Sequence, residues 1–336
     1  MADSAEGGLP LVSILTPSLN QAEFIEDCLR SVVVQDYPRL EHRVVDGGST
    51  DGTVEILRRY GSRLAGWTSR PDAGQAEAIN AGVGDSRGEI VAWLNSDDFY
   101  YRTDTVSSAV RSLLAHPEAA FVYADGVMVD EGGCLLDWHR YPALNAERLM
   151  SFEVLLQPTV FMRRAAWEES GGLRNAYRLI LDHDLWVRIA RRHPIHHVSD
   201  FWAVERTHAR AKTIADAARF VEEGLRLLAE WESDPEFRAR STDEQRRIRA
   251  GAHVFAAKRL IDAGDFAGSL RHLARAARVR PRSVLRVWYK LAHAAGGAAG
   301  LGGLFLTYRA ARRRWQHASR HLTVSEDGIR WNRPNE

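Results

Sequence analysis

Short apolar segments alternate with amphipathic segments along the first 130 residues of the chain. Three apolar segments are bounded by polar or turn-forming residues, as strands buried in a sheet are; they span residues 11–16, 90–94 and 120–124, and residues 41–45, which end in two valines, are a further predicted strand. The segments between them repeat apolar residues at helical spacing; they span residues 22–34, 54–60, 76–83 and 105–114. This alternation predicts an α/β fold with a mostly parallel central sheet.

The pattern changes after residue 125. Residues 157–162 and 201–204 are predicted strands, and residues 185–192 a predicted helix with acidic residues at its start and arginines at its end, which suits the helix dipole. From residue 214 onward the chain is predicted to be helical nearly throughout. Residues 256–281 have the spacing of one tetratricopeptide-like hairpin, which we interpret only as helix packing, because a lone repeat cannot bury its own face.

The chain is therefore expected to have three parts: a flexible tail over residues 1–9, an α/β domain over residues 10–212 and a helical region over residues 213–336. Its formal net charge of +1 gives the whole chain no polyanion-binding signature, and we expect no nucleic-acid partner. The two cysteines, Cys28 and Cys134, lie far apart in sequence, which suits a reducing compartment. Neither a signal peptide nor an apolar run of about 18 residues is found, so we expect a cytoplasmic protein.

Two adjacent carboxylates, Asp97 and Asp98, follow directly after the predicted strand at residues 90–94. Ligands of open α/β sheets bind at the carboxyl ends of the strands. Neighbouring carboxylates raise the cost of ionising one another, and a hard cation such as Mg²⁺ or Mn²⁺ would offset that cost while bridging to a diphosphate. The alternative interpretation of this segment is a solvated turn.

Two further loops carry candidate ligand-binding groups. In residues 46–52, glycines allow close approach of the backbone to a ligand, and Asp46 at the strand end can accept hydrogen bonds from a nucleobase or ribose. Residues 70–75 combine an arginine, an aspartate and a glycine before a predicted helix, a setting for a phosphate or a sugar hydroxyl. A capped turn and a surface turn are the alternatives. Neither loop matches a Walker loop or a dinucleotide fingerprint.

Taken together, these motifs resemble those of the family 2 glycosyltransferases, which have the GT-A fold. The matching segments are residues 12–20, 45–53, 72–80, 95–98 and 182–186. The resemblance covers roughly residues 10–212. It implies a three-layer α/β/α sandwich and an inverting transfer of a sugar from a UDP-, GDP- or dTDP-sugar donor to a glycan, a lipid-linked saccharide or another hydroxylated acceptor, as in polysaccharide biosynthesis.

The resemblance also implies roles for individual residues. Asp98 matches the metal ligand, with His208 as a second candidate, and Asp182 matches the catalytic base, with Asp184 as the runner-up. Gln157 and Trp186 are candidates for the acceptor side. The candidate donor-binding residues are Thr16, Pro17, Ser18, Asn20, Asp46, Gly47, Gly48, Ser49, Asp72, Gly74, Gln75, Asn80, Asn95, Asp97, Arg206 and Lys212.

Two departures from the family pattern bear on these roles. No carboxylate precedes the Asp97–Asp98 pair, so one protein carboxylate and the diphosphate would supply most of the metal ligands. This suits Mg²⁺, which keeps several water and substrate oxygens as ligands. The Glu-Asp pair that carries the base in the family is replaced by Leu181-Asp182, which leaves a non-catalytic nucleotide-sugar-binding module as an alternative function. A sugar nucleotidyltransferase is disfavoured, because residues 16–21 lack both a glycine-rich loop and a basic residue.

The C-terminal third has no acidic residue between Asp265 and Glu326, while arginines recur over residues 271–286 and 309–314. The favoured interpretation is a helical appendage whose apolar face packs on the catalytic domain and whose arginines are solvated. The alternative is a peripheral contact of these interleaved basic and apolar residues with an anionic membrane leaflet, with residues 294–306 dipping into the interface.

Overall fold

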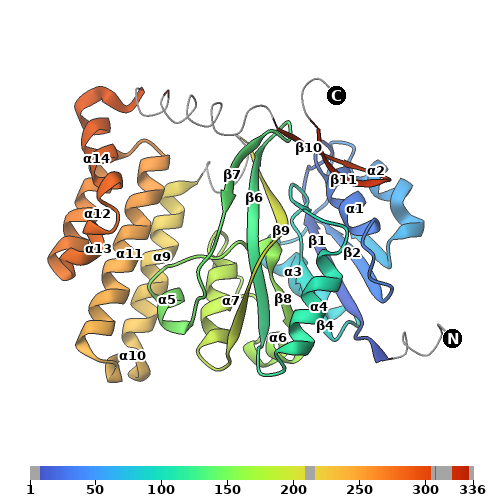
Figure 1. Cartoon of the computed structure of the whole chain (residues 1–336), viewed down its shortest axis with the longest axis horizontal. Helices are drawn as coiled ribbons and strands as arrows, with labels where there is room; N and C mark the ends of the chain where they lie inside the picture. Colours follow the sequence, from blue (N-terminus) through green and yellow to red (C-terminus); the bar gives the residue numbers. More distant parts are fainter. Residues whose placement is uncertain (1–7, 209–215, 304–306, 308–319, 333–336) are drawn as a thin grey trace.

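The computed structural model describes residues 8–208, 216–303, 307 and 320–332. A sheet domain occupies the centre of the molecule, and a region of long helices stands beside it (Figure 1). None of the described helices is both long and apolar enough to cross a bilayer.

The first half of the sheet is parallel, as predicted. It consists of β1 (Val12–Ser18), β2 (Leu40–Asp46), β3 (Gly66–Ser69) and β4 (Ile90–Trp93), in the order β3-β2-β1-β4. Three of these strands, β1, β2 and β4, match strands predicted from the sequence. The edge strand β3 was not predicted, because it has only four residues and two of them are exposed, so it lacks an apolar run.

The second half of the sheet is mixed. Strand β8 (Phe161–Arg163) runs antiparallel between β4 and β6 (Phe121–Asp130), and β9 (Ile195–Thr207) runs parallel to β6. The short β5 (Phe99–Tyr100) and β7 (Leu135–His139) pair antiparallel with β9 and β6. The predicted strand at residues 157–162 is wrong at its start: η3 (Gln157–Thr159) is a 3-10 turn, since Pro158 cannot donate to a sheet.

Helices cover both faces of the sheet. Neighbouring side chains of β1 point to opposite faces, so Leu15 enters the core under α3 (Gln75–Gly84) and α7 (Leu181–Ala190), whereas Ile14 enters the core under α1 (Ile25–Val33) and α4 (Thr105–Ala115). The remaining helices of this domain are α2 (Thr53–Tyr60), α5 (Ala146–Met150) and α6 (Arg164–Ser170). The α/β fold class is therefore confirmed.

Helix α7 begins at Leu181, one residue before the acidic segment 182–184 that was predicted to open it. Its N-cap is Ile180, which has no side-chain cap bond. Asp182 and Asp184 consequently lie inside the first turn, and neither of them is the capping residue. The acidic first turn still complements the helix dipole.

The C-terminal region is helical up to residue 303 but not beyond residue 320. Its helices are α9 (Ala217–Ser233), α10 (Pro235–Ala239), α11 (Thr242–Asp262), α12 (Phe266–Val279), α13 (Pro281–Leu285) and α14 (Trp288–Gly296), followed by η4 (Gly297–Leu301). Helices α11 and α12 form the predicted hairpin around a shared core that includes Ala257 and Leu273.

A β-hairpin, β10 (His321–Ser325) and β11 (Gly328–Asn332), corrects the expectation of helix throughout the C-terminal region. It returns to the sheet domain, where Leu322 and Val324 pack against β5, β6 and β7. The sequence analysis missed this hairpin because apolar residues alternate over only five positions and follow a strongly basic, alanine-rich segment that favours helix.

Candidate active site

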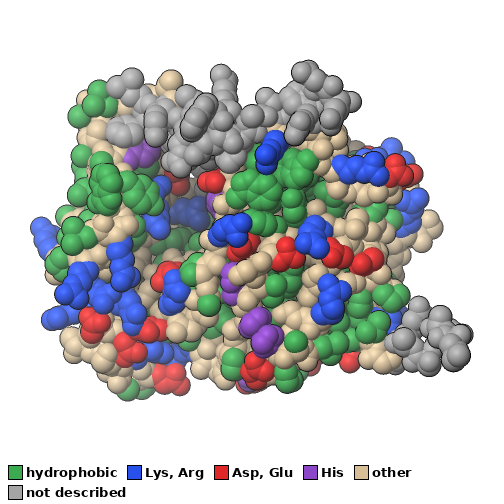
Figure 2. Space-filling view, in the orientation of Figure 1, with side chains coloured by type: hydrophobic (Ala, Val, Ile, Leu, Met, Phe, Trp, Pro, Cys, Tyr) green, Lys and Arg blue, Asp and Glu red, His purple; other side chains and the backbone are tan. Residues whose placement is uncertain are grey.

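A cleft of about 1550 Å³ opens where the carboxyl ends of β1 and β4 face the helical region. The start of α7, η3 and the end of β9 complete its sheet side, and residues of α9, α11 and α14 line the other side. Figure 2 shows this hollow between the helical region and the sheet, with Lys and Arg side chains in its depth. The cleft is the larger of the two hollows described here and contains most of the predicted site residues.

Asp97 and Asp98 lie on the floor of the cleft, directly after β4. The carboxylate of Asp98 is buried and accepts hydrogen bonds from the Arg206 amide (3.1 Å) and from Asn95 Nδ2 (3.2 Å). Burial, together with the negative charges of Asp97 and Glu205, raises the pKa of Asp98 well above its usual range. A positive group at this position would therefore be strongly favoured.

His208 follows β9 and lies beside this acidic pair. Its Nε2 is 3.2 Å from Asp97 Oδ2, and its Nδ1 has no hydrogen-bond partner among the described residues. The ring packs on Phe24, with 4.7 Å between centroids. No group of three His, Cys, Asp or Glu side chains in the described part of the chain is arranged to hold a metal by itself. The residues fit a cation that takes one or two protein ligands and fills its shell with phosphate oxygens and water.

Asp182 faces the same cleft from the first turn of α7. One hydrogen bond to its carboxylate is found, from the His183 amide to Oδ1 (2.7 Å). Burial raises the pKa of Asp182 to about 6, while the positive charge of Arg259 acts in the opposite direction. A carboxylate with this pKa is ionised at neutral pH and is still basic enough to accept a proton.

Glu205 and Arg259 were missed by the sequence analysis. Glu205 lies on β9 and lines the cleft, and burial raises its pKa to about 6, with Arg259 lowering it and with Asp97 and Asp182 raising it. Arg259 comes from α11, where its guanidinium lies over the rings of Phe220 (4.7 Å) and Phe255 (5.5 Å). A single charged residue in an apolar strand or a basic helix gives no motif, so only the fold could bring these two groups to Asp182.

Asp184, the runner-up for the base, does not line the cleft. It is 1% exposed and forms ion pairs with Arg174 and with Arg188, the latter at 3.0 Å. Both of its oxygens accept hydrogen bonds from these guanidinium groups. This geometry gives Asp184 a structural position, under the turn that presents Asp182.

Asp46 and its loop form a tight network behind the wall of the cleft. Asp46 is buried and accepts hydrogen bonds from the amides of Gly48 (3.1 Å) and Ser49 (2.8 Å) and from Ser69 Oγ (2.7 Å). Gly48 has φ +87°, and a Cβ there would lie 3.2 Å from the Pro71 nitrogen. Asp46 and residues 47–49 are thus placed beside the cleft rather than on its surface, and their carboxylate and backbone groups shape the loops at the ends of β2 and β3.

The loop after β1 is fixed to the same network. The Asn20 amide donates to Ser49 Oγ (2.7 Å), and Asn20 Oδ1 accepts from the Thr50 amide (2.9 Å). Pro17 and Ser18 line the cleft, and Ser18 Oγ has no partner among the described residues. Thr16 is buried one residue earlier, with its hydroxyl 2.9 Å from His42 Nε2, so it supports the loop from below.

A chain of side chains connects α3 to the acidic pair. Gln75 Nε2 donates to Asn95 Oδ1 (2.7 Å), and Asn95 in turn donates to Asp98. Asp72 and Gly74 also line the cleft, and the Gly74 amide donates to Asp72 Oδ1 (2.9 Å). Asn80 is placed elsewhere: its side chain both donates to and accepts from the backbone of Leu173 (2.9 and 3.0 Å), where it joins α3 to the segment before α7.

The guanidinium of Arg206 is engaged in protein contacts rather than directed at an open phosphate site. It donates to Asp27 Oδ2 (2.7 Å), to the Glu131 carbonyl (2.8 Å) and to the Asp97 carbonyl (3.2 Å). It therefore fixes the position of the acidic pair. Lys212 lies outside the described residues.

The two candidate acceptor residues both line the cleft. Gln157 Nε2 donates to the Trp93 carbonyl (2.7 Å), and its Oε1 has no partner among the described residues. Trp186 is buried and stacks on Trp93, with 5.1 Å between ring centroids. Trp186 thus forms part of the cleft's rigid apolar floor.

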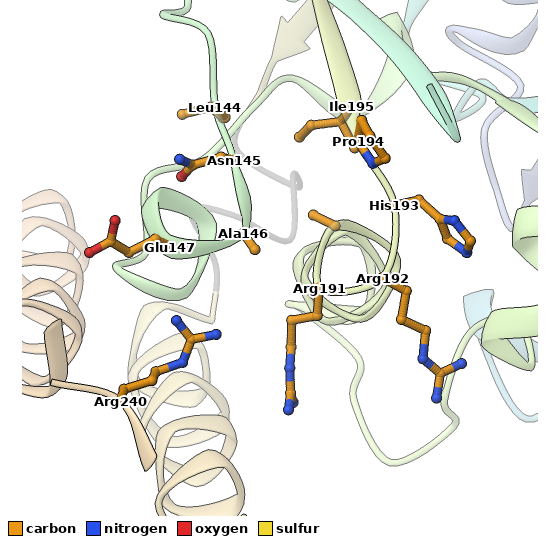
Figure 3. Close-up of a pocket in the computed structure, with 11 residues that line it drawn as sticks. Leu144, Asn145, Ala146, Glu147, Arg191, Arg192, His193, Pro194, Ile195 and Arg240 are labelled. Atoms are coloured by element: carbon orange, nitrogen blue, oxygen red, sulfur yellow. The ribbon is translucent and has the colours of Figure 1, made fainter. Parts of the chain in front are cut away.

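A second, shallower hollow of about 530 Å³ lies between residues 144–147 and 190–195 (Figure 3). Its arginines are already paired: Arg191 with Asp234 (2.6 Å) and Glu236, and Arg240 with Glu244 (3.7 Å). No unpaired carboxylate set comparable with that of the cleft was found there among the described residues, so we assign no chemistry to it.

Residues 13–162 match the family model described as "Glycosyl transferase family 2". The chain is 30% identical over 183 residues to a PGL/p-HBAD biosynthesis glycosyltransferase of Mycobacterium bovis, covering 53% of this chain and 69% of that protein. It is also 30% identical over 191 residues to the hyaluronan synthase of Pasteurella multocida, covering 56% of this chain but only 19% of that protein. The chain thus spans about a fifth of the length of this synthase.

Solved structures share the fold. S. aureus TarS 1-349 in complex with UDP-GlcNAc superposes with a TM-score of 0.60 at 16% identity, covering 96% of each chain. The mannosyltransferase PcManGT from Pyrobaculum calidifontis, in complex with GDP-Man and Mn²⁺, gives a TM-score of 0.58 at 23% identity, covering 93% of this chain and 89% of that one. From the family match and this architecture, the chain belongs to glycosyltransferase family 2 and has the GT-A fold.

Proposed function

We propose that this protein is an inverting glycosyltransferase, which moves a sugar from a nucleoside-diphosphate sugar to a hydroxyl of a glycan or a lipid-linked saccharide. The observation that carries this proposal is the convergence of Asp98 and Asp182 on one cleft from segments 84 residues apart. One carboxylate is suited to the diphosphate end of the donor and the other to the attacking hydroxyl. Family membership supports the reaction class, and the UDP-GlcNAc and GDP-Man of the structural neighbours support the donor class.

In the proposed complex the donor diphosphate lies over Asp97 and Asp98. Pro17, Ser18 and Asp72 line the cleft and are the proposed contacts to the nucleoside. Asp46 would then act through the loop that it holds, because its oxygens accept four hydrogen bonds from within the loop and from Ser69. Ser18 lines this part of the cleft, and its Oγ, which has no hydrogen-bond partner among the described residues, is the proposed contact to a ribose or base.

A divalent cation fits beside Asp98, with Asp97 and His208 as neighbouring donors. When bound there, Mg²⁺ or Mn²⁺ would stabilise the negative charge that gathers on the departing nucleoside diphosphate. The buried carboxylate of Asp98 beside the negative charge of Asp97 makes this position favourable for a cation, and Arg206 and Asn95 hold the Asp98 carboxylate in place by hydrogen bonds. Mn²⁺ in the related mannosyltransferase complex supports divalent metal use.

Asp182 is the proposed general base. It removes the proton from the acceptor hydroxyl as the oxygen forms its bond to the anomeric carbon, and the bond from that carbon to the diphosphate oxygen breaks on the opposite face. Burial raises the pKa of this carboxylate and the positive charge of Arg259 lowers it, so the two together would set its charge state. Gln157 and Trp186, together with the open side of the cleft toward α9 and α11, are the proposed acceptor side.

A thermal-shift screen of UDP, GDP and dTDP and their sugars, with and without Mg²⁺ or Mn²⁺, tests the donor proposal. A ligand at 100 times its dissociation constant stabilises the folded state by about 2.7 kcal/mol. Stabilisation by a nucleotide sugar followed by its consumption, with or without added acceptor, is expected. Binding of a sugar nucleotide with no consumption under any acceptor condition would favour a non-catalytic module, and binding of none would contradict the proposal.

A further inference from the structure

The two short helices at the far end of the helical region expose large apolar side chains. Leu285 is 68% exposed and Trp288 is 67% exposed, and Tyr289, Leu291 and Leu301 are also exposed. These residues fall within a stretch of 17 positions, and the other exposed large hydrophobic residues described are scattered singly over the molecule. Large exposed apolar side chains grouped in this way are typical of an interaction site, whereas single exposed residues are ordinary.

Helix α14 is turned so that its apolar face points to solvent. Trp288, Leu291, Ala292 and Ala295 recur at helical spacing and are all exposed. Ala294 is buried against the α11–α12 hairpin. Among the described residues, nothing therefore packs on the side of this helix where an amphipathic surface helix would carry polar residues.

Cations border this apolar face. Arg271, Arg275 and Arg278 are exposed along one side of α12, and Arg282 and Arg286 are exposed on α13. No aspartate or glutamate occurs from residue 266 to residue 325. Figure 2 shows hydrophobic side chains at the α14 end of the helical region and a group of Lys and Arg side chains next to them. The surface thus combines an apolar centre with a rim of one sign of charge.

We propose that the α13–α14 surface, defined as Arg282, Leu285, Arg286, Trp288 and Leu291, docks on an anionic lipid bilayer. A helix that lies in the membrane interface buries its apolar face at the boundary of headgroups and acyl chains, and its cations contact anionic headgroups. This surface offers both groups in adjacent positions. A second copy of the chain is a poorer occupant, because two such surfaces would bring their arginines together.

Docking in this way places the mouth of the active-site cleft next to the bilayer. Lys290 and His293 lie on the other side of α14 and line the cleft, so one helix borders both the lipid surface and the site. The membrane proposal goes beyond the proposed transfer reaction and does not depend on it, since binding to vesicles can be measured without any sugar donor.

Co-sedimentation of the full chain with vesicles tests the proposal. We expect binding to phosphatidylcholine vesicles that contain phosphatidylglycerol, little binding to phosphatidylcholine alone, and release at high ionic strength. Each cation near an anionic surface contributes roughly fivefold in partitioning, so Arg282→Glu with Arg286→Glu is expected to lower binding at least about 25-fold. Trp288→Ser with Leu291→Ser removes the apolar centre and is expected to lower binding at least about tenfold.

Matched control variants lie on α4, far from this surface in sequence. Leu114 is 56% exposed and Arg111 is exposed, so Leu114→Ser and Arg111→Glu make the same chemical changes and are expected to leave vesicle binding unchanged. Melting temperatures close to that of the wild type would establish that all variants fold. Equal loss in the control and the test variants, or no binding of the folded wild type to anionic vesicles, would overturn the proposal.

Two further measurements distinguish a lipid bilayer from other partners of the α13–α14 surface. Light scattering after size exclusion is expected to give the same mass for the wild type and for Trp288→Ser. A wild-type dimer that dissociates in Trp288→Ser would show that a second copy of the chain, and not lipid, occupies this surface. Tryptophan fluorescence is expected to shift to shorter wavelength with anionic vesicles in the wild type but much less in Trp288→Phe. The same shift in both would place the membrane contact elsewhere and overturn the assignment.

Discussion

Asp182 and Asp184 lie two residues apart in the first turn of α7 and allow the same substitution to be compared in two settings. Asp182 faces the cleft and accepts one hydrogen bond from within the turn, whereas Asp184 is buried between Arg174 and Arg188. We predict that Asp182→Asn abolishes transfer without loss of stability, and that Asp184→Asn destabilises the fold while donor binding by the folded protein is kept. Each variant is thereby the control for the other.

The expected magnitudes follow from the surroundings of the two carboxylates. Removing one partner of a buried ion pair costs about 3–5 kcal/mol, but Arg174 and Arg188 are 38% and 22% exposed and regain part of this from water, so about 2–3 kcal/mol is expected for Asp184→Asn. In a chain of this size, that corresponds to a fall in melting temperature of roughly 3–5 °C. Loss of a positioned general base lowers turnover by about 100- to 10,000-fold.

Stability should not fall in Asp182→Asn, and the direction follows from the pKa. Folding raises the pKa of Asp182 to about 6, so the ionised form is less favourable in the folded than in the unfolded chain. The folded state therefore loses stability as the pH rises from the ordinary aspartate value toward 6, and stays penalised above it. A neutral asparagine removes that penalty, and the melting temperature at pH 7 is expected to be equal to or higher than that of the wild type.

The assay combines calorimetric titration of the donor nucleotide, steady-state transfer and thermal unfolding on the three proteins. If Asp182→Asn weakened donor binding as much as it lowered turnover, Asp182 would be a donor ligand or a structural residue rather than the base. If Asp184→Asn left the melting temperature unchanged and stopped transfer, the two assignments would have to be exchanged.

The remaining predictions concern pH, metal and packing. Transfer should rise with pH through a midpoint near 6 as Asp182 loses its proton. Arg259→Gln should move that midpoint upward, because the positive charge of Arg259 lowers the pKa of Asp182. If Glu205→Gln moved the midpoint instead, the titrating group would be Glu205. A chelator should weaken nucleotide affinity at least about tenfold in the wild type but hardly in Asp98→Asn, and equal affinities with and without chelator would contradict the metal assignment. Gly88→Ala should lower the unfolding free energy in urea by about 1–3 kcal/mol, since its Cβ would lie 2.5 Å from the Ser13 nitrogen and 2.8 Å from the Ile90 carbonyl oxygen. Gly84→Ala, which meets nothing within 4 Å, should be neutral or stabilising, and equal losses in the two would contradict the packing argument.

The sequence predicted the parallel half of the sheet because β1 and β4 carry apolar runs and because strand and helix signals alternate along the chain. β1, β2 and β4 fall at predicted strands, and α1 to α4 fall at predicted helices. The elements that were missed or misplaced depend on tertiary contacts: β3 is a short, half-exposed edge strand, and β10–β11 is stabilised by packing on β5, β6 and β7. The residues of one strand alone do not show which other strands it will pack against.

The acidic residues of the cleft could be predicted for a similar reason. Asp97 and Asp98 stand at the carboxyl end of a buried strand, and the sheet places that end at the ligand-binding edge. The motifs alone could not show that Asp46 and Arg206 hold protein loops in place instead of facing a ligand. Whether a polar group faces a loop or the cleft depends on neighbours from other parts of the chain. Glu205 and Arg259 carry no local signal, and only the approach of β9 and α11 brings them to Asp182.

A crystal structure of the protein with a nucleoside diphosphate and Mn²⁺ would address the central idea most directly, because manganese is located by its anomalous scattering. We predict one manganese peak in contact with the Asp98 carboxylate and the diphosphate, with Asp182 across the cleft on the side from which an acceptor would approach. Nucleotide bound outside this cleft, or manganese bound away from Asp98, would contradict the account.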